Sequence, residues 1–138
     1  MNNVKVKCDW YFYDQDGRLL MGPLSNWVTV AGLATIAALL GNVSAPYLVI
    51  GDDTASGETI TETYRQAVSS VTRDGPIVRF RTQLAAADGN GNHQKACIFT
   101  GGTAVAGTGT MLNLLVAPWS KTSSMVLTVE ARFTVADG

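Results

Sequence analysis

The segment from Met125 to Val135 alternates between apolar and polar residues over its whole length. This period of two is the pattern of a β-strand that buries one face and leaves the other in solvent. Because the rest of the chain is also β-like, the sequence predicts a packed β scaffold. The apolar positions of the segment are Met125, Leu127, Val129, Ala131, Phe133 and Val135.

The first part of the chain repeats this alternation. Val4 to Tyr13 reads as a strand, and residues 14–17 (Asp-Gln-Asp-Gly) are typical of a turn because Gly accepts positive φ and Asp bonds its own backbone. Arg18 to Met21 then returns as a second strand. The sequence therefore predicts an N-terminal hairpin over residues 4–21.

Residues 29–40 are the one segment with good helical spacing. Thr29 can cap the first turn, and Gly41 is a suitable stop. Almost every residue between them is apolar, with Leu33 and Ile36 on the repeating face. Such a helix needs to be buried nearly all round, either in its own domain or under a neighbouring subunit.

The remaining strand-like segments are separated by turns at short intervals. Asp74-Gly75 is a strong hairpin signal, and we expect hairpins that join 65–72 to 77–84 and 111–117 to 125–135. Further strands are expected at 47–50 and 94–99.

About seven to nine strands with turns every 8–12 residues are typical of an antiparallel sandwich or barrel. The sequence thus predicts an all-β fold with one short helix, as an antiparallel β-sandwich or a jelly-roll-like barrel. With 138 residues and 46% hydrophobic content, we expect residues 1–138 to form a single β-sandwich domain. The hairpin 4–21 and the helix 29–40 are its additions.

Charge and hydropathy exclude several function classes. The net charge is -1, which gives little basis for neutralising nucleic-acid phosphates. The apolar stretch from Trp27 to Leu40 is interrupted and shorter than the ~20 residues of a membrane span. The N-terminal residues lack the apolar core of a signal peptide, so we expect synthesis in a cytosol.

Only 15% of the residues are charged, against roughly 25% in an average soluble protein. Two interpretations stand: part of the surface is buried against other subunits, or the chain is simply a neutral protein rich in Thr and Gly. The two cysteines, Cys8 and Cys97, do not make a disulfide framework, and we expect two reduced, mostly buried thiols.

No pattern of catalytic residues is recognisable. His93 is the sole histidine and is expected on the surface of a loop. Asp52 and Asp53, with Glu58 nearby, could hold a cation, whereas a solvated turn or capping of backbone N–H groups is the simpler interpretation. The glycines of residues 101–109 predict a hairpin loop and not a phosphate loop. We therefore expect no enzymatic activity, no cofactor and no metal.

Aromatic and arginine side chains are the candidates for an interface, since such residues dominate binding hot spots. Trp10 is the first candidate for a buried core position among the aromatics. Arg79 and Arg81 share one strand face and form either a basic strip for carboxylates or ordinary solvated charges. The candidate interface residues are Tyr11, Tyr13, Trp27, Arg79, Arg81 and Trp119.

Several short segments resemble a recurrent pattern in small virion proteins of tailed bacteriophages. These segments are 32–41 (GLATIAALLG), 47–55 (YLVIGDDTA), 62–65 (ETYR), 68–71, 100–103 (TGGT), 110–112 (TML) and 121–122 (KT) before the final strand. The resemblance covers roughly residues 32–135. Here the GDDT loop is shorter and the 107–109 turn longer than in that pattern, and the N-terminal hairpin lies outside it.

The resemblance implies a structural virion component that is made in the cytoplasm of a bacterial host and resides in the virion. Within that class we favour a capsid decoration (cement) protein that braces coat subunits, because the chain lacks the repetitive shaft of a fibre. A tail, baseplate or fibre-attachment component is the alternative. A carbohydrate- or cation-binding sandwich module is the alternative of another class. The expected partners are other copies of the chain, most simply as a trimer, and major capsid or tail proteins.

Overall fold

The computed structural model describes residues 3–138 and is mostly β, with 51% of strand and one short helix. Several sheets pack together, so the predicted all-β, sandwich-like fold is confirmed. The elements in chain order are β1 (Val4–Val6), β2 (Asp9–Tyr13), β3 (Leu19–Ser25), α1 (Val30–Leu40), β4 (Tyr47–Gly51), β5 (Glu62–Ala67), β6 (Ser70–Asp74), β7 (Ile77–Leu84), β8 (Gly91–Thr100), β9 (Thr110–Met111), β10 (Leu115–Lys121) and β11 (Leu127–Asp137).

Two sheets form the body of the molecule. The first sheet has the order β1-β11-β7-β6, in which β1 runs parallel to β11 and the other pairs are antiparallel. The second sheet has the order β10-β8-β4-β5, is antiparallel throughout, and carries β9 as a short extra partner of β8. The alternating C-terminal segment of the sequence is thus the long strand β11.

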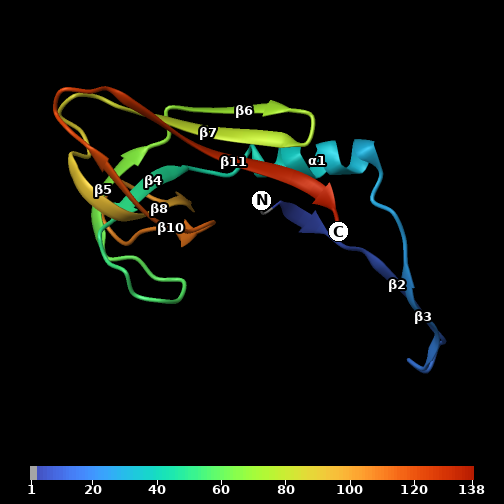
Figure 1. Cartoon of the computed structure of the whole chain (residues 1–138). Coiled ribbons are helices and arrows are strands. Elements are labelled where there is room, and N and C mark those ends of the chain that lie inside the picture. Colours follow the sequence, from blue (N-terminus) through green and yellow to red (C-terminus); the bar gives the residue numbers. More distant parts are fainter. Residues whose placement is uncertain (1–2) are drawn as a thin grey trace.

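The core lies on one face of the β7–β11 ladder. Phe80 and Phe133 meet there edge to face, with ring centroids 5.5 Å apart. The second sheet contributes Leu48, Ile50 and Ile98 to the same buried cluster. The helix α1 and the second sheet lie side by side against this face of the first sheet (Figure 1), so one long ladder supports both.

The second sheet is covered on its outer face as well. Val49, Cys97 and Phe99 form a smaller buried cluster there, with Ile60 and Met111 packed against it. Two loops, residues 52–61 and 101–109, provide this cover. Strands β4 and β8 are therefore buried on both faces, which is why Tyr47–Ile50 reads as an uninterrupted apolar run.

The helix begins where the sequence predicts it. Thr29 is the N-cap, and its Oγ1 accepts a hydrogen bond from the Gly32 N–H at 3.0 Å. However, only Ala37 is fully buried, while Val30 and Leu39 are exposed. The expectation that the helix is buried nearly all round is therefore wrong within its own domain. Within residues 3–138, no helix is long and apolar enough to cross a membrane.

The expected hairpin between 65–72 and 77–84 differs in its first strand. Residues 65–72 do not form one strand. The chain leaves the second sheet after Ala67, and β6 alone forms the hairpin with β7. The crossing is fixed by the Ser69 N–H, which donates to the Arg81 carbonyl at 2.8 Å. The predicted Asp-Gly turn is correct, but the strand before it begins only at Ser70.

The expected hairpin between 111–117 and 125–135 is wrong. β10 pairs with β8 in the second sheet, whereas β11 pairs with β7 and β1 in the first. The segment between them, 122–126, crosses from one sheet to the other. Both strands have an apolar side, so pairing them with each other satisfied the pattern equally well.

The N-terminal hairpin is also shifted from its predicted bounds of 4–21. β1 belongs to the first sheet, and the hairpin consists of β2 and β3, residues 9–25. We call residues 9–25 the arm. It forms a two-stranded sheet of its own and extends away from the body (Figure 1).

A matched pair of helix variants tests this packing. Ile36 packs against the main core whereas Leu39 is exposed. An isolated charge forced into the core costs several kcal/mol. We therefore expect Ile36→Asp to lower the free energy of unfolding by roughly 3 kcal/mol or more, and Leu39→Asp by only about 1 kcal/mol, the cost of a poor helix former with an unfavourable charge in the last turn. Urea unfolding of both variants measures this, and equal losses would contradict the assigned helix face.

Candidate assembly interface

The arm carries many large apolar side chains, and these side chains are exposed. Trp10 is 55% exposed, so its expected place in the core is wrong. A two-stranded ribbon in water is at most marginally stable on its own. The exposed large apolar residues of the arm are Trp10, Tyr11, Phe12, Tyr13, Leu19, Leu20, Met21 and Leu24.

The arm has two apolar faces. On β2, Trp10 and Phe12 lie on one face, with ring centroids 6.4 Å apart and planes 19° from parallel. Because side chains alternate along a strand, Tyr11 and Tyr13 lie on the other face. In β3, Leu24 is the register partner of Trp10. Apolar side chains therefore cover both sides of the ribbon.

Local polar contacts define the shape of the arm at both ends. At the tip, Asp14 Oδ1 accepts hydrogen bonds from the N–H groups of Asp16 and Arg18, both at 2.9 Å. Gly17 has a φ of 81°, which a side-chain-bearing residue rarely adopts. At the root, Trp10 Nε1 donates to Asn26 Oδ1 at 2.9 Å. The turn chemistry read from the sequence is thus the chemistry that forms the tip.

Exposed apolar residues also lie between the arm and the helix. Trp27 is 84% exposed in the segment that joins β3 to α1, and Val30 in the first helical turn is exposed to the same extent. The N–H of Val28, between them, donates to Asp137 Oδ1 at 3.4 Å. Three of the candidate interface residues, Tyr11, Tyr13 and Trp27, are therefore exposed in the arm and in the segment that follows it.

The arginine candidates lie elsewhere, on the outer face of the first sheet. Arg81 Nε donates to Glu130 Oε1 at 2.6 Å, and Arg132 bonds the other oxygen of the same carboxylate. Arg79 approaches Glu130 at 4.0 Å. These hydrogen bonds, that from Arg81 foremost, lower the pKa of Glu130 below its usual 4.5. Three arginines thus surround one carboxylate on a solvated face.

The last candidate, Trp119, is half-buried. Its ring lies 4.6 Å from that of His93, and its Nε1 has no hydrogen-bond partner among the described residues. His93 is buried, and its Nε2 lies 2.7 Å from the Gly89 carbonyl oxygen. The expected surface loop position of His93 is therefore wrong: it is a packed residue of β8 that fixes the preceding turn.

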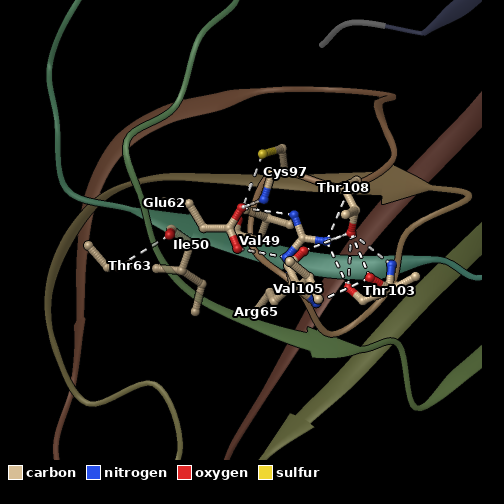
Figure 2. A network of polar contacts seen from close by, with 10 residues as sticks. Val49, Ile50, Glu62, Thr63, Arg65, Cys97, Thr103, Val105 and Thr108 are labelled. Carbon is tan, nitrogen blue, oxygen red and sulfur yellow. Dashed lines mark hydrogen bonds and ion pairs between the residues drawn. The ribbon is translucent and has the colours of Figure 1, made fainter.

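A buried arginine holds the glycine-rich loop 101–109 onto the second sheet (Figure 2). Arg65 in β5 forms a bidentate pair with Glu62, at 2.6 and 2.8 Å. Its Nη1 donates to the carbonyl oxygens of Thr103 and Thr108, both at 3.0 Å. The Gly107 N–H donates to Glu62 at 3.1 Å. An ion pair thus pins the glycine-rich loop to the second sheet.

The same guanidinium lies over two aromatic rings. Its Cζ is 5.6 Å from the centroid of Tyr47 and 5.4 Å from that of Phe99. Hydrogen bonds from Arg65 lower the pKa of Glu62 below its usual 4.5, so the pair stays ionised at neutral pH. The network therefore holds the loop 101–109 against the second sheet.

A buried lysine holds the other covering loop in the same way. Lys95 is fully buried, and its Nζ donates to Asp53 Oδ1 at 2.7 Å and to the carbonyl oxygens of Ala55 and Thr59 at 2.9 and 2.7 Å. The hydrogen bond from Lys95 lowers the pKa of Asp53 from 3.8 to about 2. Asp53 is thus already occupied by a cationic side chain.

Asp53 also accepts hydrogen bonds from the N–H groups of Ala55 and Thr61. Asp53 thus caps backbone N–H groups, as the simpler interpretation of the Asp52-Asp53 pair predicted. The buried Lys95 binds the same carboxylate. Among residues 3–138, no group of three or more His, Cys, Asp or Glu side chains could hold a metal ion. The loop geometry therefore gives no support to a cation site there.

A third buried cation, Lys121, fixes the turn before β8. Its Nζ donates to Asn90 Oδ1 at 2.7 Å and to the carbonyl oxygens of Ala86 and Thr122 at 3.2 and 3.4 Å.

The cysteines are both unpaired: Cys97 is buried and Cys8 is exposed near the root of the arm. The expectation of a buried thiol is therefore wrong for Cys8. Burial raises the pKa of Cys97 to about 12.

Comparison with known proteins gives no relative: no family model, curated protein or solved structure matches this chain. Only the chain's own residues therefore point to the candidate interface. Sequence reasoning omitted Phe12 and Leu20 from it. Their signal was present in the same segment, because residues 10–13 and 19–21 are apolar or aromatic at consecutive positions and so present such side chains to both faces of a ribbon.

The Lys95–Asp53 pair makes a pH-dependent prediction. Asp53 ionises more readily in the folded chain, with a pKa of about 2, than at its ordinary value of 3.8. Its stabilising contribution is therefore complete well above pH 3.8 and is lost as the pH falls toward 2. We expect Asp53→Asn to lower the free energy of unfolding at about pH 6, and this difference to shrink steadily toward about pH 2.

Denaturant unfolding of wild type and variant across that pH range measures the effect. Asp52→Asn is the matched control, because Asp52 is the exposed neighbour. The control is expected to follow the wild type at every pH. A loss of stability in Asp53→Asn that does not change with pH would contradict the role given to the carboxylate.

Proposed function

We propose that this chain is a non-enzymatic structural subunit of a bacteriophage virion, a capsid decoration (cement) protein that braces neighbouring coat subunits. The observation that carries the proposal is the arm. Within residues 3–138, this ribbon forms a sheet of its own and leaves large apolar side chains exposed on both faces. Such a surface is typical of a protein that is incomplete until it is assembled.

The design of the body supports the same function. Three buried cationic side chains, Arg65, Lys95 and Lys121, tie down loops that their composition alone would leave loose. None of these cations faces an open site. Their hydrogen bonds end on backbone carbonyls, on loop side chains and, for Arg65, on Glu62 of the same strand, so they hold the loops against the body.

The resemblance to small virion proteins adds the identity of the assembly. Its segments, from 32–41 to 121–122, lie in α1 and in the strands and loops of the two sheets. The arm lies outside the resemblance. In this proposal the body is the part shared with such proteins, and the arm is the part that adapts this chain to its own neighbours.

The copy number of the chain in purified particles tests the proposal. We expect quantitative mass spectrometry to find it in an amount comparable to the major capsid protein, which means copies on the order of hundreds for a symmetric shell. We also expect particles assembled without it to lose their contents at a lower temperature, and purified chain added back to restore the wild-type value.

The other outcomes decide between the remaining functions. A copy number equal to one small ring, with labelling at a single vertex, would place the chain in the tail and overturn the decoration function. Absence from purified particles would overturn the virion function altogether. Saturable binding to a glycan array by the free chain would favour a carbohydrate-binding module instead.

A further inference from the structure

One edge of β11 has no strand beside it over most of its length. β1 pairs with β11 only at residues 135–137, and β7 takes the opposite edge over residues 127–134. Among residues 3–138, no strand pairs with the β1 side of β11 before Val135. In Figure 1, β1 accordingly lies beside only the C-terminal end of β11. The first sheet therefore has an open strand position next to its longest strand.

Two hydrogen bonds identify the free backbone groups at this edge. The Val135 N–H donates to the Pro76 carbonyl on the β7 side, and the Gly138 N–H donates to the Val6 carbonyl on the β1 side, both at 2.9 Å. Because the backbone groups of successive residues alternate between the two edges of a strand, the even-numbered residues of β11 face the β1 side. Within residues 3–138, nothing bonds the N–H and C=O groups of Thr128, Glu130 and Arg132. Such an unpaired row is a template for a further strand.

The burial of the inner side chains changes where β1 ends. Val135, which lies beside β1, is 2% exposed, and Phe80 on β7 is fully buried. Val129, Ala131 and Phe133 lie on the same inner face, since side chains alternate along a strand, but they are only partly buried. The core is therefore incomplete along the open edge of β11.

Two adjoining hollows lie where this edge approaches the second sheet. The first has a volume of about 170 Å³ and is lined by Val129 and Ala131 on one side and by Ile98 and Leu115 on the other. The second has a volume of about 380 Å³, shares Leu115 and extends to Phe133. An apolar cavity of ~150 Å³ is large enough to hold a benzene ring. Each hollow can therefore receive a large apolar side chain.

The outer face of β11 beside the same edge has a surplus of positive charge. Arg132 is the register partner of Arg79 on β7, and like charges opposite each other on a sheet repel. Three arginines share the one carboxylate of Glu130, and the side chain of Arg132 is 55% exposed. Arg132 is also the arginine on the strand that carries the open edge. A negative charge on a neighbouring strand would therefore be stabilised there.

We propose that the open edge of β11 binds an extended segment of a partner protein as an additional strand of the first sheet. The backbone of this segment pairs with the free groups of residues 128–132. Alternate side chains of the segment are apolar and enter the two hollows. Those between them lie on the outer face and include an acidic residue next to Arg132. In such strand addition the main-chain hydrogen bonds give affinity and the alternating side chains give specificity.

The charge of the edge distinguishes this partner from a second copy of the chain. Strand β11 of a copy would bring three more arginines and only one more glutamate to the same outer face. The alternating segment 4–8 (VKVKC) carries two lysines. Either segment would add to the positive surplus, whereas an acidic strand of a different protein reduces it. The proposed occupant is therefore a segment in which apolar and acidic residues alternate.

Selection from a library of random ten-residue peptides, with the full-length chain immobilised, tests the proposal. Ala131→Trp fills the first hollow with the chain's own side chain and serves as the negative selection. Peptides that bind the wild type but not this variant are expected to alternate apolar residues with polar ones that include Asp or Glu. Val105→Trp adds the same ring at an exposed position of the loop 101–109 and is expected to bind these peptides like the wild type.

Three results of the selection would overturn the proposal. The first is that no peptide distinguishes the wild type from Ala131→Trp. The second is that the enriched peptides are basic or lack the alternation. The third is that the chain alone forms a dimer that Ala131→Trp dissociates, because the edge would then belong to a second copy.

A charge reversal tests the acidic residue of the partner. We expect Arg132→Glu to weaken binding of a selected peptide roughly tenfold, since an attraction between exposed charges becomes a repulsion. Replacing the acidic residue of the peptide by Lys is expected to restore binding to this variant. Arg18→Glu makes the same change in net charge at the tip of the arm, where the side chain is 79% exposed, and is expected to leave binding unchanged. Equal weakening by both variants would contradict a specific contact with Arg132.

Amide hydrogen exchange, followed residue by residue by NMR, distinguishes strand addition from adhesion of a peptide to the surface. In the free chain, the N–H groups of Glu130 and Arg132 are expected to exchange fast, and those of Val129 and Ala131, which face β7, slowly. A bound peptide is expected to slow exchange at Glu130 and Arg132 at least tenfold. Binding without this added protection would overturn the strand pairing.

This inference goes beyond the proposed function, and the two fail separately. A chain that binds alternating acidic peptides but is absent from particles would keep the strand site and lose the virion function. A chain that is abundant on shells but whose β11 edge binds no peptide would do the reverse.

Discussion

The antiparallel ladder between β7 and β11 is the contact on which the rest of the structure depends. Its inner face supports α1 and the second sheet together, with Phe80 at the centre of the shared core. At its far edge, Val4 of β1 pairs with Val135, so the ladder also fixes the strand from which the arm departs. All these pairings join residues distant in sequence, which is the kind of contact that slows folding.

Individual strands could be predicted because alternation is local, whereas their partners could not. Residues 111–117 and 125–135 each offer one apolar face, and nothing within either segment distinguishes β8 from β11 as the neighbour. Residues 65–72 read as one strand since the step between sheets takes only Val68 and Ser69. The turn at Asp74-Gly75 was predictable because its chemistry lies in the turn itself.

The candidate interface was predictable only in part for the same reason. Tyr11, Tyr13 and Trp27 stood out by residue type, but Trp10 read as a core residue because an alternating strand is expected to have one buried face. Whether that face is covered depends on elements outside the strand. His93 shows the converse error: a lone histidine among glycines suggested a surface loop, yet Trp119, distant in sequence, packs on it.

The use of charge connects the body to the arm. Three of the ten Lys and Arg residues lie buried as ties for loops, and Arg79, Arg81 and Arg132 gather around Glu130. Little charge is then left to keep the remaining surface, including the arm, apart from other copies, because charge repulsion is what opposes association. The scarcity of charge in this chain and its exposed aromatic ribbon therefore both support the proposed role in an assembly.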